Sequence, residues 1–102
     1  LVIILMNNVE LQNNEFLRQF ETNFNGSLAR IEYAEQERKI FLTKLVIPGD
    51  VCDVEFEESF IKSVLEFISE KNLRVVPTSP KIAGFVRRNK CYKSLLPVGI
   101  KL

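Results

Sequence analysis

The sequence predicts an α/β fold in which a mixed, mostly antiparallel sheet packs with one long helix and one short helix. Its first half alternates apolar and polar residues on both sides of a turn signal, Asn25-Gly26, as half-buried strands do. At Val54 the apolar spacing becomes that of a helix, and a short strand and a second helix follow. Because 102 residues provide for one hydrophobic core and little more, we expect a single domain over residues 1–102.

The first six residues, Leu1 to Met6, are all apolar. This run is far shorter than the roughly 18 residues that a membrane helix needs. It also lacks the basic flank and the small-residue cleavage site of a secretory signal. We expect either a short buried or edge strand, or an extension upstream of a natural start at Met6.

A β-hairpin is predicted around Asn25-Gly26. Residues 18–24 alternate before it and residues 29–33 resume the alternation after it. Asn-Gly is a strong hairpin signal because both central residues of a type I′ turn take positive φ. A two-residue turn pairs Phe20 with Ile31 on the buried side and Glu21 with Arg30 on the solvent side. The apolar pattern and the charge pairing therefore favour one register.

A strand and a long helix follow the hairpin. After a charged turn, Ile40 to Ile47 is a nearly continuous apolar run, which is typical of a central strand. Beyond Val54, one helical face carries the apolar residues Phe56, Phe60, Ile61, Val64, Leu65 and Ile68. Asp53 is a suitable N-cap, and Asn72 suits the left-handed residue that ends a helix.

The C-terminal third begins with a second short strand, Leu73 to Val76, which should lie parallel to the strand before the helix. Pro80 then begins a short helix that runs to about Arg88, with Ser79 as its N-cap. The remaining residues form a tail with alternating Leu, Val and Ile, under which we expect Cys91 to pack.

The composition excludes several classes of function. The 14 basic and 13 acidic residues give a net charge of +1, so we expect neither nucleic acid nor a membrane as partner. The sequence contains no histidine, which removes Ser-His and Cys-His pairs and histidine-ligated zinc. Two cysteines, Cys52 and Cys91, are too few for a structural metal site, and we expect no metal. Free thiols and the missing export signal predict a cytoplasmic protein.

The second half of the chain resembles a known family. It contains, in order, Thr43-x4-Pro48, a helix, Leu73-Arg74-Val75-Val76-Pro77-Thr78-Ser79-Pro80, Phe85-Val86-Arg87-Arg88 and Tyr92. This order is similar to the small stand-alone GNAT-like N-acetyltransferases, which carry V-P, R-G-x-G-I at the helix start, K-V-x-P-x-C-P, Y-I-R-R and a final Tyr. The match runs without a gap from about Ile40 to Tyr92, and the resemblance implies a reduced GNAT-like fold.

Members of such a family bind acetyl-CoA, with its pyrophosphate on backbone amides at the turn before the long helix. In the gapless register, Cys52 stands at the family arginine, Asp53 and Glu55 stand at the two glycines, and Phe56 stands at the isoleucine. The resemblance thus implies a degenerate phosphate-binding turn, in which carboxylates replace the glycines of the family. The same acids stabilise the start of a helix, and both roles can hold at once.

Further site residues follow from the same register. Arg87 and Arg88 match the family and are candidates to contact CoA or an acidic partner, although a solvated helix face is the plain alternative. Ser79 stands where the family has a cysteine considered as an acyl acceptor. A serine without any histidine is a poor nucleophile, and a role as the N-cap of the second helix explains it better. No side chain stands out as a base, so Glu32, Glu35 or a water would serve.

The resemblance implies an acetyl-CoA-dependent N-acetyltransferase-like protein that would transfer acetyl to an amine of a small molecule or a protein. The altered turn implies weak cofactor binding, with activity reduced or lost. The alternative is a non-catalytic binding or assembly module that keeps the acetyltransferase fold.

Overall fold

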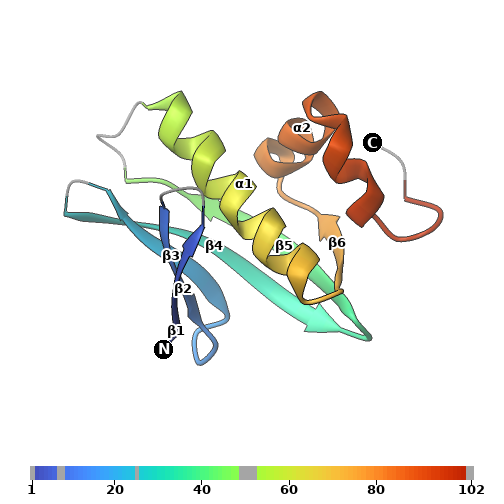
Figure 1. The fold of residues 1–102 in the computed structure, drawn as a ribbon, viewed down its shortest axis with the longest axis horizontal. Coiled ribbons are helices and arrows are strands. Elements are labelled where there is room, and N and C mark those ends of the chain that lie inside the picture. The colour runs from blue at the N-terminus through green and yellow to red at the C-terminus, as the bar shows by residue number, and fades with distance from the viewer. Residues whose placement is uncertain (1, 7–8, 25, 49–52, 101–102) are drawn as a thin grey trace.

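The computed structural model describes residues 2–6, 9–24, 26–48 and 53–100 as two layers, a six-stranded sheet and two helices that lie side by side over it (Figure 1). The strands are β1 Val2–Met6, β2 Val9–Asn14, β3 Gln19–Phe24, β4 Ser27–Gln36, β5 Lys39–Val46 and β6 Arg74–Pro77. The helices are α1 Val54–Glu70, α2 Pro80–Arg88 and a 3₁₀ helix, η1, Lys90–Leu95.

The sheet order follows the chain order from β1 to β6. Neighbouring strands are antiparallel except β5 and β6, which are parallel and connected through α1. The predicted mixed, mostly antiparallel sheet with one long and one short helix is therefore confirmed. The apolar run at the start of the chain forms β1, at one edge of the sheet, and pairs with β2, a strand that the sequence analysis did not predict.

The predicted hairpin register is confirmed. Phe20 lies opposite Ile31, and Glu21 lies opposite Arg30. Phe24 pairs with Ser27, so the loop has two residues, and Gly26 has a φ of +82°. The other loop residue, Asn25, lies outside the described residues, so the type I′ assignment stays a prediction.

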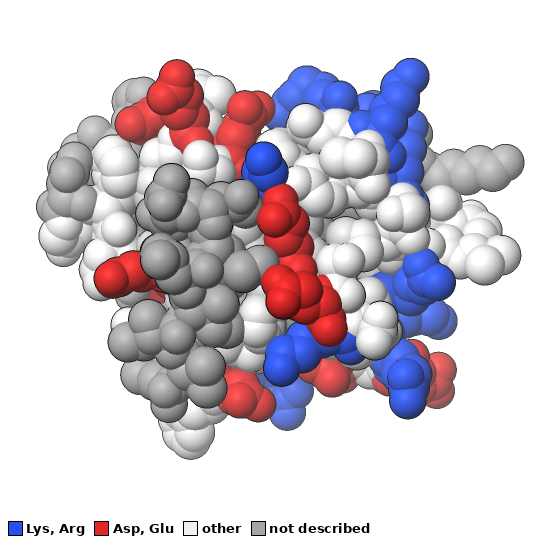
Figure 2. Space-filling view, in the orientation of Figure 1, with Lys and Arg blue, Asp and Glu red and all other residues white. Residues whose placement is uncertain are grey.

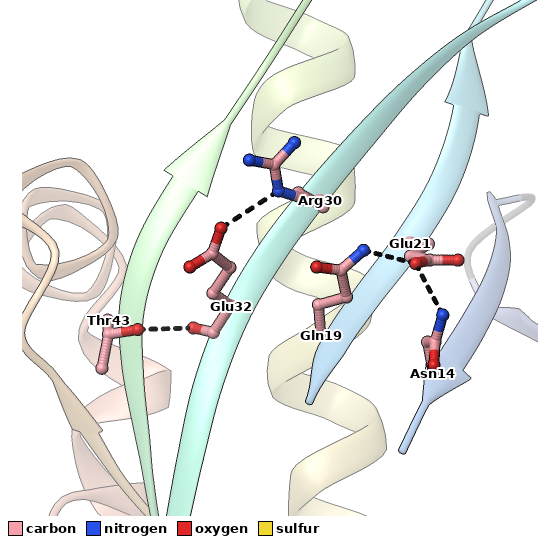
Figure 3. Close-up of polar contacts among 6 residues, drawn as sticks. All are labelled: Asn14, Gln19, Glu21, Arg30, Glu32 and Thr43. Atoms are coloured by element: carbon pink, nitrogen blue, oxygen red, sulfur yellow. Dashed lines mark hydrogen bonds and ion pairs between the residues drawn. The ribbon is translucent and has the colours of Figure 1, made fainter. Parts of the chain in front are cut away.

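The expectation that Glu21 faces solvent is wrong. Only 7% of this residue is exposed, because β3 lies between β2 and β4 and neighbouring side chains cover it. Its carboxylate accepts hydrogen bonds from the Gln19 amide and from Asn14 Nδ2, the latter at 3.0 Å (Figure 3). Arg30 instead pairs with Glu32 on its own strand, at 3.1 Å. These side chains lie on the sheet face away from α1, which is behind the sheet in Figure 3.

The core lies between the sheet and the helices. The predicted apolar stripe of α1 supplies its centre, with Phe60, Ile61, Val64, Leu65 and Ile68 buried. Fully burying one such side chain contributes about 1.5–3 kcal/mol. Both predicted ends of α1 are confirmed: Asp53 is the N-cap, and Asn72 has a φ of +58°. No helix in the described part of the chain is long and apolar enough to span a bilayer.

The C-terminal segment folds back onto the domain through η1. The Tyr92 hydroxyl donates to Glu66 of α1 at 2.9 Å, and Arg74 of β6 donates to the Ser94 carbonyl at 2.7 Å. Tyr92, Leu95 and Leu96 pack against the core, which directs the preceding Cys91 outward. The expectation that Cys91 packs under the tail is therefore wrong, because it is exposed as a free thiol.

Candidate functional site

Strands β5 and β6 separate in the middle of β5. They pair from Lys39 with Arg74 up to Leu42 with Pro77, and the backbone N–H groups of Thr78 and Ser79 then both donate to the Leu42 carbonyl at 3.1 Å. Beyond this point β5 continues to Val46, while the chain after β6 enters α2. On the side away from β4, residues 43–46 therefore form an edge of the sheet with no described strand beside it. Such an edge presents backbone donors and acceptors to a ligand.

A β-bulge lies at the point of separation. Leu42 is paired with Tyr33 and Lys44 is paired with Glu32, so Thr43 is an extra residue on β5. The Thr43 hydroxyl donates to the Glu32 carbonyl at 3.1 Å, which ties the bulge to β4 (Figure 3). A bulge bends its strand and increases the local twist, and this bulge lies where β5 stops pairing with β6.

The start of α1 is occupied by acidic side chains. Asp53 Oδ1 accepts a hydrogen bond from the Phe56 amide at 3.0 Å, and Glu55 and Glu57 lie in the first turn. A helix start otherwise offers unpaired N–H groups and a positive dipole end to an anion. Here one of those amides is already bonded to a carboxylate. The remaining predicted residue of this turn, Cys52, lies outside the described residues.

Phe56, predicted at a cofactor-binding position, packs within the protein. Its ring centroid lies 4.2 Å from that of Phe24 at the end of β3 and 6.2 Å from that of Phe60. This half-buried ring therefore joins the first turn of α1 to the β3–β4 hairpin.

The basic residues of α2 face the acids of α1. Arg88 Nη2 lies 3.3 Å from Glu58 Oε2, and Lys81 Nζ lies 3.7 Å from Glu57 Oε1. A groove of about 330 Å³ between the two helices is lined by Glu55, Glu58, Ser59, Lys62, Phe85 and Asn89. Arg87 and Arg88 are thus both exposed, and Arg88 pairs with Glu58 across the two helices. Figure 2 shows the same separation of charge, with acidic side chains over α1 and basic side chains toward α2 and the C-terminal segment.

Ser79 occupies the N-cap position of α2, but its side chain makes no capping hydrogen bond. The predicted N-cap position is therefore confirmed, but the Ser79 hydroxyl does not supply the capping hydrogen bond. The backbone fixes this residue instead: its N–H donates to Leu42, and its carbonyl accepts from Ala83 at 2.9 Å. Ser79 is 5% exposed and the chain has no histidine, so nothing here activates it as a nucleophile.

The structure separates the two carboxylates considered as bases. Glu32 lies beside the bulge, where its carboxylate pairs with Arg30. Glu35 lies opposite Ile40, on the part of β4 that is away from the separating strands. Only Glu32 is thus near the open edge of β5.

Two features of this region had no signal in the sequence. The bulge depends on how β4 and β5 pair, and the Thr78 hydroxyl donates at 3.0 Å to a carbonyl of β5 that is 36 residues away in the chain. Among the described residues, no group of three or more acidic or cysteine side chains is placed to hold a metal ion.

A mixed, mostly antiparallel sheet with a crossover helix between the parallel strands β5 and β6 agrees with the GNAT-like fold that the resemblance implied. The family model described as GCN5-related N-acetyl-transferase matches residues 19–95, well over half of the sequence. The chain therefore belongs to the GCN5-related N-acetyltransferase family, as the resemblance implied, and members of this family generally use acetyl-CoA.

The fold is also that of a known solution structure. A GCN5-like protein from Staphylococcus aureus, determined by NMR, matches with a TM-score of 0.65, and 94% of each chain is covered. The two sequences are 20% identical, so this likeness concerns the fold alone. No curated protein matches the sequence.

Proposed function

We propose that this protein is an acetyl-CoA-dependent N-acetyltransferase-like protein whose affinity for the cofactor is weakened by the carboxylates at the start of α1. The acceptor is an amine of a small molecule or a protein. The observation that carries the proposal is the hydrogen bond from the Phe56 amide to the Asp53 carboxylate, because it fills a position that an anion would take. The exposed free thiol of Cys91 supports a reducing compartment such as the cytoplasm.

The two halves of acetyl-CoA fit this chain unequally. The open edge of β5 at residues 43–46 offers backbone groups to the amides of the pantetheine arm. The phosphates would meet Asp53, Glu55 and Glu57 instead of free amides and a cation. The residues present therefore suit the acyl end of the cofactor and not its pyrophosphate.

The size of this effect follows from Coulomb's law. Two unit charges about 7 Å apart repel by roughly 2 kcal/mol at an effective dielectric constant near 20, before salt screens them. Because about 1.4 kcal/mol is a factor of ten in affinity, two such carboxylates weaken binding by a factor of tens to thousands. We therefore expect a dissociation constant for acetyl-CoA higher than about 100 μM. This value results when a micromolar dissociation constant is raised by that factor.

Calorimetric titration with acetyl-CoA tests the proposal on the variant Cys52→Arg, Asp53→Gly, Glu55→Gly. This variant supplies a cation, removes two carboxylates and frees the Phe56 amide. Its affinity should exceed that of the wild type at least tenfold, and the gain should be larger at low salt than at high salt.

The control carries the same change of net charge elsewhere, as Glu10→Gln, Glu15→Gln, Glu35→Gln, and should bind acetyl-CoA as the wild type does. Tight binding by the wild type would contradict the proposed role of the acids. A folded triple variant that gains nothing would instead support the second candidate, a non-catalytic binding module. The same Asp53 cap favours that candidate, because α1 no longer needs a phosphate at its end.

A further inference from the structure

A second cavity lies at the other end of α1, away from the open edge of β5. It has a volume of about 290 Å³ and lies among the C-terminal end of α1 and strands β2, β3, β4 and β5. Ile40 and Ile68 contribute to its wall, and the cofactor groups discussed above play no part in it.

Three aromatic rings surround this cavity. The Phe20 and Tyr33 ring centroids are 4.8 Å apart, and the Phe67 ring meets Phe20 edge-on at 5.7 Å and 74°. Phe20 and Tyr33 are buried and Phe67 is half-buried, so the rings are held in place by the core. The negative faces of such rings attract cations.

Two carboxylates lie at the opening. Glu15 and Glu35 both line the cavity and are exposed, and neither carboxylate forms an ion pair or hydrogen bond with a described residue. Burial, together with the negative charge of Glu15 and Glu35, raises the pKa of the Tyr33 hydroxyl. The Arg18 guanidinium and the hydrogen bond to Asn13 lower that pKa by less. Both carboxylates are thus close enough to act on the phenol at the wall of the cavity.

The protein already places one ammonium group against these rings. Lys71 Nζ lies 5.4 Å from the centroid of the Phe67 ring, and it makes no ion pair with a described carboxylate. This contact shows that the wall of the cavity accepts an ammonium group. It also makes Lys71 a competitor for any external cation.

We propose that this cavity binds an organic cation, an ammonium group on a short aliphatic body. The ammonium would lie between the rings and the carboxylates of Glu15 and Glu35, and the aliphatic body would contact Ile40 and Ile68. An anion fits less well, because the two unpaired carboxylates lie at the opening of the cavity. The inference does not rest on the proposed acetyltransferase function, since it involves other residues.

The probe for this site is n-butylammonium, with butan-1-ol as its neutral counterpart. Backbone amide NMR shifts of the full chain, recorded without acetyl-CoA, report where each compound binds. Butylammonium should shift the amides around Tyr33 and Phe67 with a dissociation constant at least tenfold lower than that of butanol. Equal affinities would overturn the proposal, because they would show that the charge does not contribute.

Variants test the individual contributions. The double variant Glu15→Gln, Glu35→Gln should bind butylammonium at least fivefold more weakly, whereas Glu10→Gln, Glu55→Gln, with the same change of charge, should bind as the wild type does. Lys71→Met should bind more tightly, because the internal ammonium is removed and the stem is kept.

A decrease in affinity for Lys71→Met, or equal losses in both double variants, would contradict the assignment. Phe67→Leu should lose binding while the thermal unfolding transition remains cooperative, and unaltered binding would argue against the aromatic contribution. Failure of acetyl-CoA to bind anywhere would leave these results unaffected, so the two proposals fail separately.

Discussion

The Asp53 cap can be separated into its hydrogen bond and its charge by comparing two substitutions. Asp53→Asn keeps an oxygen that can accept from the Phe56 amide, whereas Asp53→Ala removes both the acceptor and the charge. The residue is exposed, with φ of −119° and ψ of 100°, the extended conformation usual for an N-cap. Neither substitution disturbs the core, so differences in stability arise at the helix end.

The expected magnitudes differ. Loss of an N-cap acceptor costs about 1 kcal/mol, and loss of the charge–dipole attraction at an exposed site costs about 0.3–1 kcal/mol at low ionic strength. Asp53→Asn should therefore lose only the smaller amount, and Asp53→Ala should lose both. Since 1 kcal/mol shifts the Tm of a small domain by about 4–8 °C, the two variants should differ by roughly that much.

Thermal unfolding followed by circular dichroism at low and high salt measures both contributions. High salt should bring Asp53→Asn close to the wild type, because it screens the charge. The deficit of Asp53→Ala should largely remain, because a hydrogen bond is not screened in this way. Equal Tm values for the two variants at all salt concentrations would refute the cap, and with it the argument that Asp53 fills the anion position.

Three further predictions concern other parts of the molecule. Gly26→Val should destabilise the protein by about 1–3 kcal/mol, because a β-branched residue resists positive φ. Gly84→Ala, within α2, should instead stabilise it by about 0.5–1 kcal/mol. Equal Tm values for the two variants would contradict the described backbone. Both tyrosines, Tyr33 and Tyr92, have a raised pKa, chiefly because burial disfavours the phenolate. The native protein should then show little phenolate absorbance at pH 10, where a free phenol with a pKa of 10.0 is half ionised. The stability that each protonated phenol contributes should be complete below pH 10 and decline as pH rises toward the folded-state pKa. Half-ionisation at pH 10 would contradict this burial. Finally, both cysteine thiols should react with an alkylating agent after unfolding without reductant, and an intact mass two units lower would show a disulfide instead.

Features that depend on residues near one another in sequence could be predicted. The β3–β4 register follows from a turn signal and two alternations that agree, and the bounds of α1 follow from a stripe, a cap and Asn72. Family membership followed from the motifs between Ile40 and Tyr92, although the family model begins at residue 19.

Features that depend on which strands lie side by side could not be predicted. The burial of Glu21 follows from its position between β2 and β4, and a single hairpin gives no sign of β2. The bulge at Thr43 is likewise a property of the paired strands. Ser79 begins α2 as predicted, but the hydrogen bond from its backbone to Leu42 fixes it there, which the sequence does not show.

The second cavity was missed for a related reason. Its rings come from β3, β4 and α1. Glu15 comes from the turn between β2 and β3, and Glu35 comes from the end of β4. In the sequence, Phe20 and Tyr33 are ordinary apolar members of alternating strands, and Glu35 belongs to a charged turn. Only the fold brings an aromatic surface and two unpaired carboxylates together.

The measurement that tests the central claim most directly is an NMR titration of the wild-type protein with acetyl-CoA. The cofactor should shift the backbone amides of residues 43–46 and of the first turn of α1. The shifts should be in fast exchange and should approach saturation only above about 100 μM. This is the concentration expected when a micromolar affinity is weakened by a factor of tens to thousands. Shifts confined to other parts of the sheet, saturation at low micromolar concentration, or no shifts at millimolar cofactor would each contradict the account.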